Sequence, residues 1–125
     1  MLTIQADFGA VKIVTGVTTQ GRQDADEWID AFFVSYSTND VVWTFVRDAA
    51  SGIKLLFRGN VDRDTLMESE LPEPVLARYV RLHPLTSHGA VSLRWDVRGC
   101  NNGKYVVICG VCCKCVVLME VSCCS

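Results

Sequence analysis

The segment QDADEWID, residues 23–30, concentrates four carboxylates around a tryptophan. The acidic residues are Asp24, Asp26, Glu27 and Asp30. Carboxylate oxygens are ligands that Ca²⁺ prefers, but their spacing here matches no calcium-binding loop. We therefore predict a solvated acidic turn without a cofactor, with Ca²⁺ as the alternative. Trp28 either stacks on a sugar ring or anchors a protein partner, or it packs inward at the start of a strand.

A second polar group lies in PLTSHGA, residues 84–90, where Thr86, Ser87 and His88 follow one another. Hydroxyl and imidazole groups supply the donors and acceptors that sugar hydroxyls or a lipid headgroup require. An ordinary polar turn is the alternative interpretation.

The histidines do not indicate catalysis. His83 and His88 are the only two in the chain, and they lie five residues apart around Pro84. On one strand this odd separation places them on opposite faces, and no glutamate lies between them as in a helical zinc motif. A serine–histidine–aspartate set can be composed from Ser87, His88 and Asp96, but nothing in the sequence places the three together. We predict that the chain is not an enzyme.

Length and composition limit the classes of protein. The 125 residues suffice for one domain, and half of them are apolar, which excludes a disordered chain. The net charge of −2 supplies no attraction to nucleic acid or to an anionic membrane. No apolar stretch reaches the roughly 20 residues of a membrane-spanning helix, and the N-terminus lacks the basic region and apolar run of a signal peptide. We predict no nucleic-acid partner, no transmembrane segment and no signal peptide in this chain.

Alternation of apolar and polar residues dominates the chain before residue 100. In the first such stretch Ile4, Ala6 and Phe8 share one face. This alternation, together with abundant β-branched and aromatic residues and regular turn signals, predicts short antiparallel strands packed as a sandwich or a barrel. The strand candidates are residues 3–9, 11–21, 28–37, 41–46, 53–57, 77–83 and 91–99.

The stretch ARYVRLHP, residues 77–84, shows how such a strand distributes its charges. On a strand Val80 and Leu82 point one way. The side chains that point the other way are Tyr79, Arg81 and His83. The arginines are then spaced by the pleat rather than by chemistry, and we expect Arg81 to pair with Asp7 or Asp96 on a neighbouring strand.

Prolines are expected to limit this strand. Pro84 lacks a ladder N–H and marks the end of the strand. Pro72 and Pro74 are expected to keep ELPEP a loop before the strand begins.

Six pieces of the sequence occur in an order that resembles a known family. They are IQADFG, VTGVTTQGR, FFVSYSTNDVVWTFV, KLLFRGNVDRDT, PEPVLARYVRLHP and LRWDVRGC. In sequence and spacing they resemble the coagulation factor V/VIII type C domain, also called the discoidin domain, over about residues 3–100. The resemblance implies an all-β, eight-stranded antiparallel jelly-roll sandwich. It also implies an extracellular or cell-surface module that binds phospholipid headgroups, carbohydrates, collagen or other proteins, often in cell adhesion.

The chain departs from the family pattern at its N-terminus. Family domains begin well upstream of the piece that matches IQADFG, with a cysteine that bonds to the one matching Cys100. We therefore interpret residues 1–100 as a partial domain in which Cys100 lacks its disulfide partner. The first strand or strands and two of three projecting loops have no counterpart. A truncated gene product, a splice variant and a faulty gene model each fit this pattern.

The resemblance places ligand contacts on loops at one end of the sandwich, where loops vary while the sheets hold them in place. Two such loops have counterparts here, residues 23–30 and 84–90. The predicted contact residues are Asp24, Asp26, Glu27, Trp28, Thr86, Ser87 and His88. Carboxylates with no nearby base are costly to place in a low-dielectric layer, so membrane insertion is disfavoured. We predict a glycan or an extracellular protein as the ligand, with phospholipid less favoured.

A second function, from another class, stays open. A sandwich without its first strands exposes a strand edge. The chain would then be a structural or interaction fragment with no ligand of its own. It would pair through this edge with a second copy or with another chain by β-augmentation.

Residues 101–125 differ from the rest of the chain in composition. All seven cysteines lie between Cys100 and Cys124, and valine and cysteine dominate the segment. We predict that this tail is not part of the fold, and that a G/T-rich non-coding stretch read past a splice site accounts for it. The alternatives are a zinc site and reversible palmitoylation. Both rest on Cys109, Cys112, Cys113, Cys115, Cys123 and Cys124.

Overall fold

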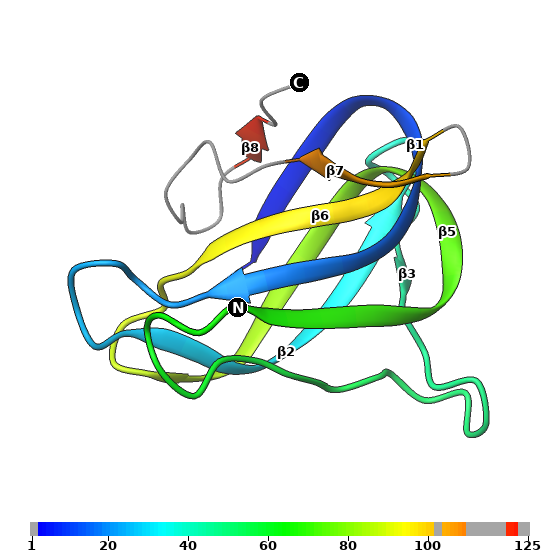
Figure 1. Cartoon of the computed structure of the whole chain (residues 1–125). Helices are drawn as coiled ribbons and strands as arrows, with labels where there is room; N and C mark the ends of the chain where they lie inside the picture. The colour runs from blue at the N-terminus through cyan, green and yellow to red at the C-terminus, as the bar shows by residue number, and fades with distance from the viewer. Residues whose placement is uncertain (1–2, 102–103, 110–119, 123–125) are drawn as a thin grey trace.

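The computed structural model describes residues 3–101, 104–109 and 120–122, which form strands and their connections (Figure 1). In this part of the chain no helix is long and apolar enough to cross a bilayer. The strands are β1 (Ile4–Gln20), β2 (Trp28–Ser37), β3 (Thr44–Phe45), β4 (Phe57–Arg58), β5 (Met67–His88), β6 (Arg94–Asn101), β7 (Lys104–Cys109) and β8 (Glu120–Ser122).

The strands pair in the order β3-β2-β5-β1-β6-β7, with β4 on β2 and β8 on β1. Every pairing is antiparallel except that of β8 with β1. The two long strands pair twice: residues 4–7 of β1 with residues 79–82 of β5, then residues 12–19 with residues 67–77. Figure 1 shows both long ribbons curving through a bend between these stretches. The chain is therefore all-β, as its alternation predicts.

A bulge forms the bend in β1. Residues 8–11 oppose Arg78 alone, and Gly9 adopts a positive φ of 78° that glycine reaches without strain. The Asp7 carboxylate closes the bend, because it accepts the Gly9 N–H at 2.8 Å and the Arg78 Nε and Nη2 groups at 2.9 and 3.1 Å. These bonds, that to Arg78 above all, lower the pKa of Asp7, although burial acts in the opposite direction.

The prolines do not limit β5 as expected, because the strand runs from Met67 to His88. Its ladder with β1 shifts register between Glu70 and Val75, so Pro72 and Pro74 lie where the described ladder has no β1 partner. Pro84 lies in β5 beside a register shift in the ladder with β2. A missing N–H is tolerated at such irregularities.

The alternation along the strands sorts the side chains as predicted. Val80 and Leu82 are 1% and 0% exposed, whereas Arg81 and His83 on the other face are partly exposed. The buried apolar core comprises Ile4, Ala6, Phe8, Val14, Val17, Ile29, Phe32, Val34, Val46, Phe57, Leu71, Ala77, Val80, Leu82, Leu93, Trp95 and Val97. Both paired stretches of β1 and of β5 contribute residues to this core, so the core runs along both long strands.

The strands predicted over residues 41–46 and 53–57 are shorter than expected. β3 and β4 have two residues each, and the hairpin between them has one isolated bridge, between Arg47 and Lys54, and a few further main-chain hydrogen bonds. Residues 38–56 instead pass over the outer face of β2 and β5, where their side chains contact His83 and Arg81.

Main-chain pairing continues beyond Cys100, since β7 pairs with β6 and β8 pairs with residues 5–7 of β1. The zinc and palmitoylation interpretations depend on cysteines of which Cys112, Cys113, Cys115, Cys123 and Cys124 lie outside the described residues. The division of the chain at residue 100 stays a prediction.

Candidate functional site

Three segments meet at one end of the sandwich: residues 21–27, residues 59–66 and the end of β5. A Cβ on Gly21 would lie 2.5 Å from Arg63 Cα, so only glycine permits this approach. Arg94 joins the same two segments, because it donates to the carbonyls of Gly21 at 2.8 Å and Arg63 at 3.0 Å.

Asn60 anchors the second of these segments. Its buried side-chain amide donates to the carbonyls of Thr19 and Thr65, each at 2.9 Å. Its backbone N–H donates to the Ile29 carbonyl at 2.8 Å. The three hydrogen bonds that Asn60 donates to main-chain carbonyls therefore help to hold this end of the molecule together.

Trp28 and His88 stack against each other at this end. They are register partners, Trp28 at the first position of β2 and His88 at the last of β5. Their ring centroids are 4.1 Å apart and the ring planes differ by 8°. Trp28 is partly buried and His88 is exposed. The structure thus brings the two predicted segments together, with one face of the indole covered by the imidazole.

Thr86, Ser87 and His88 were expected on a loop, and this expectation is wrong. They are the last three residues of β5, and they pair with residues 28–31 of β2. The Thr86 hydroxyl donates to the Asp30 carboxylate, and the Ser87 hydroxyl donates to the Gly89 carbonyl at 3.1 Å. Both hydroxyl oxygens can still accept bonds. Since Ser87 donates to a main-chain carbonyl and His88 stacks on an indole, the serine–histidine–aspartate arrangement is not formed.

Three of the four acidic residues, Asp24, Asp26 and Glu27, have basic partners, contrary to the expectation of no nearby base. Arg22 lies between Asp24 at 2.7 Å and Glu27 at 2.8 Å. Arg63 lies 3.6 Å from Asp26. Arg63 lies far from Asp26 in the sequence, so no local pattern could predict their pairing. Arg22, in contrast, adjoins the acidic run. Among the described residues, no group of three or more histidine, cysteine, aspartate or glutamate side chains is placed to hold a metal ion.

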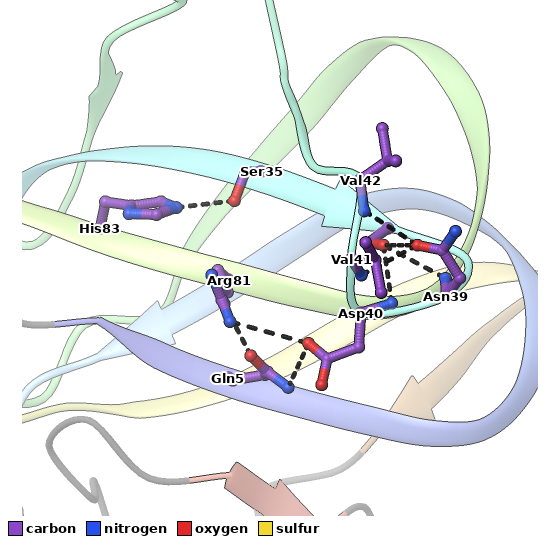
Figure 2. A network of polar contacts seen from close by, with 9 residues as sticks. Gln5, Ser35, Asn39, Asp40, Val41, Val42, Arg81 and His83 are labelled. Carbon is purple, nitrogen blue, oxygen red and sulfur yellow. Dashed lines mark hydrogen bonds and ion pairs between the residues drawn. The ribbon is translucent and has the colours of Figure 1, made fainter.

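A second polar cluster lies on the outer face of β2 and β5 (Figure 2). Ser35 Oγ and His83 Nε2 are hydrogen-bonded at 2.7 Å. Arg81 donates to Gln5 Oε1 at 2.6 Å and lies 3.7 Å from the Asp40 carboxylate. Gln5 also donates to Asp40 at 3.5 Å. No signal in the sequence pointed to Ser35 as the partner of His83.

The prediction that Arg81 pairs with Asp7 or Asp96 is therefore wrong. Arg81 lies directly opposite Gln5 in the ladder, and the loop after β2 brings Asp40 to it. Asp7 bonds instead to Arg78, which the bulge places beside it.

Aromatic rings of residues 38–56 cover this cluster. The Arg81 guanidinium lies 3.8 Å from the Trp43 ring centroid, and the Lys54 amine lies 3.9 Å from that of Phe45. Phe45 in turn lies 4.8 Å from the His83 ring. Burial, with smaller effects of the Arg81 and Lys54 charges, lowers the pKa of His83 to about 4. His83 is thus neutral at physiological pH, and its contacts hold the loop on the sheet.

The chain matches the model of the F5/8 type C domain over residues 2–97. It is 38% identical over 100 residues to retinoschisin of Takifugu rubripes, covering 79% of this chain and 35% of that protein. It is 34% identical over 98 residues to human retinoschisin (78% and 43%) and 33% identical over 99 residues to bovine lactadherin (78% and 23%). The chain therefore spans less than half the length of these relatives.

Solved structures show the same fold. The wild-type discoidin II of Dictyostelium discoideum superposes with a TM-score of 0.63 at 26% identity, over 79% of this chain and 34% of that one. The recombinant discoidin II gives a TM-score of 0.61 at 30% identity, over 70% and 33%. The predicted antiparallel jelly-roll sandwich is confirmed.

Proposed function

Because this chain belongs to the F5/8 type C, or discoidin, domain family of extracellular binding modules, we propose that it binds a glycan or a protein surface through the end where Trp28 stacks on His88. The stack is the observation that carries the proposal. The contact set is the one singled out in the sequence: Asp24, Asp26, Glu27, Trp28, Thr86, Ser87 and His88.

The stacked rings support recognition of a flat, partly apolar ligand surface. The stack fixes the orientation of both rings, so little side-chain entropy remains to be lost on binding. An indole edge and an exposed imidazole combine apolar contact with hydrogen-bonding nitrogens. The face of a sugar ring with its hydroxyls, or a polar protein surface, has matching chemistry.

The charged groups support the same class of ligand. Arg22 and Arg63 hold three carboxylates, those of Asp24, Asp26 and Glu27. Charges of both signs lie at this end, with carboxylates in excess because Asp30, Asp62 and Asp64 also belong to it. This pattern suits a neutral glycan or a mixed protein surface better than a polyanion.

Insertion into a phospholipid layer is less favoured. The same five charged groups would have to enter or border a medium of low dielectric constant, and exposed ion pairs do not offset that desolvation. Binding to phospholipid through Trp28 would therefore contradict the proposal.

The test is binding of the full chain to a glycan array and to liposomes of phosphatidylcholine with phosphatidylserine. We expect retention on a defined group of glycans, a loss of about tenfold or more in Trp28→Ala, and much smaller loss in Trp28→Phe, which keeps an aromatic face. Strong liposome binding that Trp28→Ala abolishes would contradict the proposal. Size-exclusion chromatography of the same samples tests edge pairing, which predicts a concentration-dependent dimer and no Trp28-dependent ligand.

A further inference from the structure

The sandwich opens at the end of β2 that is remote from Trp28. Along the inner face of β2, Phe32 and Val34 are 0% and 2% exposed, but Tyr36 is only partly buried. A cavity of about 350 Å³ begins there, within the range of small-ligand sites. It is lined by Tyr36, by residues 44–49 and by Pro72, Glu73 and Val75.

This cavity is distinct from the Trp28–His88 end. Trp28 and Tyr36 are eight positions apart on one strand, which corresponds to about 26 Å at the rise of an extended chain. The cavity walls come from the hairpin that begins at β3 and from the bulged part of β5.

The walls of the cavity are apolar and aromatic. Tyr36 of β2 and Val75 of β5 both pack on the core, and Val46 is itself buried. Pro72 completes these walls, whereas the ring of Phe45, another lining residue, lies on the outer face of β2 against His83. Such a surface suits a hydrocarbon stem or a ring, not a strongly hydrated ion alone.

The rim of the cavity carries the carboxylates of Asp48 and Glu73 and the guanidinium of Arg47, so its formal net charge is −1. Asp48 accepts bonds from Ser51, and the Arg47 guanidinium donates to the Gly52 carbonyl at 3.1 Å, both within their own hairpin. In the described part of the chain, Glu73 has no hydrogen bond or ion pair. The prolines that flank Glu73 have no N–H to offer an anion.

We propose that this cavity receives an arginine or lysine side chain of a partner protein, with its stem on the apolar walls and its charge beside Glu73. The chain already uses such chemistry twice nearby, where Lys54 lies on Phe45 and Arg81 lies on Trp43. The site does not depend on the ligand at the Trp28–His88 end.

The probe for this site is N-acetyl-arginine amide, titrated into the isotope-labelled full chain and followed by NMR. Its matched control is N-acetyl-citrulline amide, which has nearly the same shape and no charge. We expect saturable shifts of Tyr36, Val46 and Val75 with a dissociation constant of about 1–10 mM, and no shift of the Trp28 indole. Equal shifts with the citrulline compound, or none at Tyr36 and Val75, would overturn the proposal.

Two variants separate the rim charge from general electrostatics. Glu73→Gln is expected to weaken binding about two- to fivefold, the effect of one solvent-exposed ion pair. Glu68→Gln, an exposed acid elsewhere on β5, should leave it unchanged. An equal loss in both variants would show attraction by net charge and sink the site. Trp28→Ala should leave this titration unaltered, whatever it does to glycan binding.

Discussion

Asp7 and Arg78 form a two-bonded ion pair across the bulge that bends β1. The same carboxylate accepts the Gly9 N–H, so one side chain joins the turn of β1 to the strand beside it. Arg78, spaced on its strand by the pleat, thus acts as a support for the fold.

This pair predicts a loss of stability in acid. The pKa of Asp7 is lowered in the folded chain, so its contribution is complete above the unfolded value of about 3.9 and falls as the pH falls through the lower folded value. Asp7→Asn should lower the unfolding free energy by about 1 kcal/mol at pH 7 and by much less at pH 2. Urea unfolding at the two pH values measures the difference. Asp64→Asn is the control; an equal pH effect in both variants would refute the role of the pair.

His83 predicts a second pH effect with the same sign. Its pKa is about 4 in the folded chain, mainly through burial, against about 6.5 in the unfolded chain. Stability should be complete above pH 6.5 and decline as the pH falls toward 4, because the unfolded state takes up the proton first. In His83→Gln the urea midpoint should no longer fall between pH 6.5 and 4 because of this residue. Titration of the native His83 ring near pH 6.5 by NMR would contradict the assignment.

Gly21 is predicted to be intolerant of a side chain for reasons of space. Its Cβ would lie 2.5 Å from Arg63 Cα, a backbone atom that cannot move alone. Gly21→Ala should lower the unfolding free energy by about 2 kcal/mol or more. Gly52→Ala is the matched control, because Gly52 has a positive φ of 74° but open space around it; it should cost about 1 kcal/mol. Similar costs for both would mean that residues 59–66 are not held as described.

Asp40 combines backbone strain with a useful charge. Its φ is 63°, and its carboxylate meets Arg81 and Gln5. Asp40→Gly relieves the strain and loses the contacts, so we expect a net change within about 0.5 kcal/mol. Asp40→Val loses the contacts and adds β-branched strain, and should cost about 2 kcal/mol. Thermal unfolding of both variants measures the difference; equal values would show that this conformation is unimportant.

Local geometry explains what could be predicted from the sequence. Side-chain alternation depends only on the extended backbone, so the opposite faces of Val80 and Arg81 followed from their spacing. Which residues lie opposite one another depends on bulges. The bulge at residues 8–11 carries Asp7 to Arg78, and the register shift after Glu70 allows two prolines inside β5. No local sequence pattern predicts the bulge or the register shift.

The candidate site shows the same division. Trp28 and His88 were both singled out by residue type, but their stacking depends on a β2–β5 register with two irregularities between residues 29 and 32. Arg63 reaches Asp26 from a distant segment, so the charge balance of this end could not be read from residues 23–30 alone.

Whether the stacked rings form the contact surface is tested most directly by the NMR signal of the Trp28 indole N–H while a glycan retained on the array is added to the full chain. If the stacked rings form the contact surface, this signal and those of the His88 ring shift and saturate together, and Trp28→Ala removes binding. A glycan that binds while both sets of signals stay fixed would show that the ligand lies elsewhere on the domain.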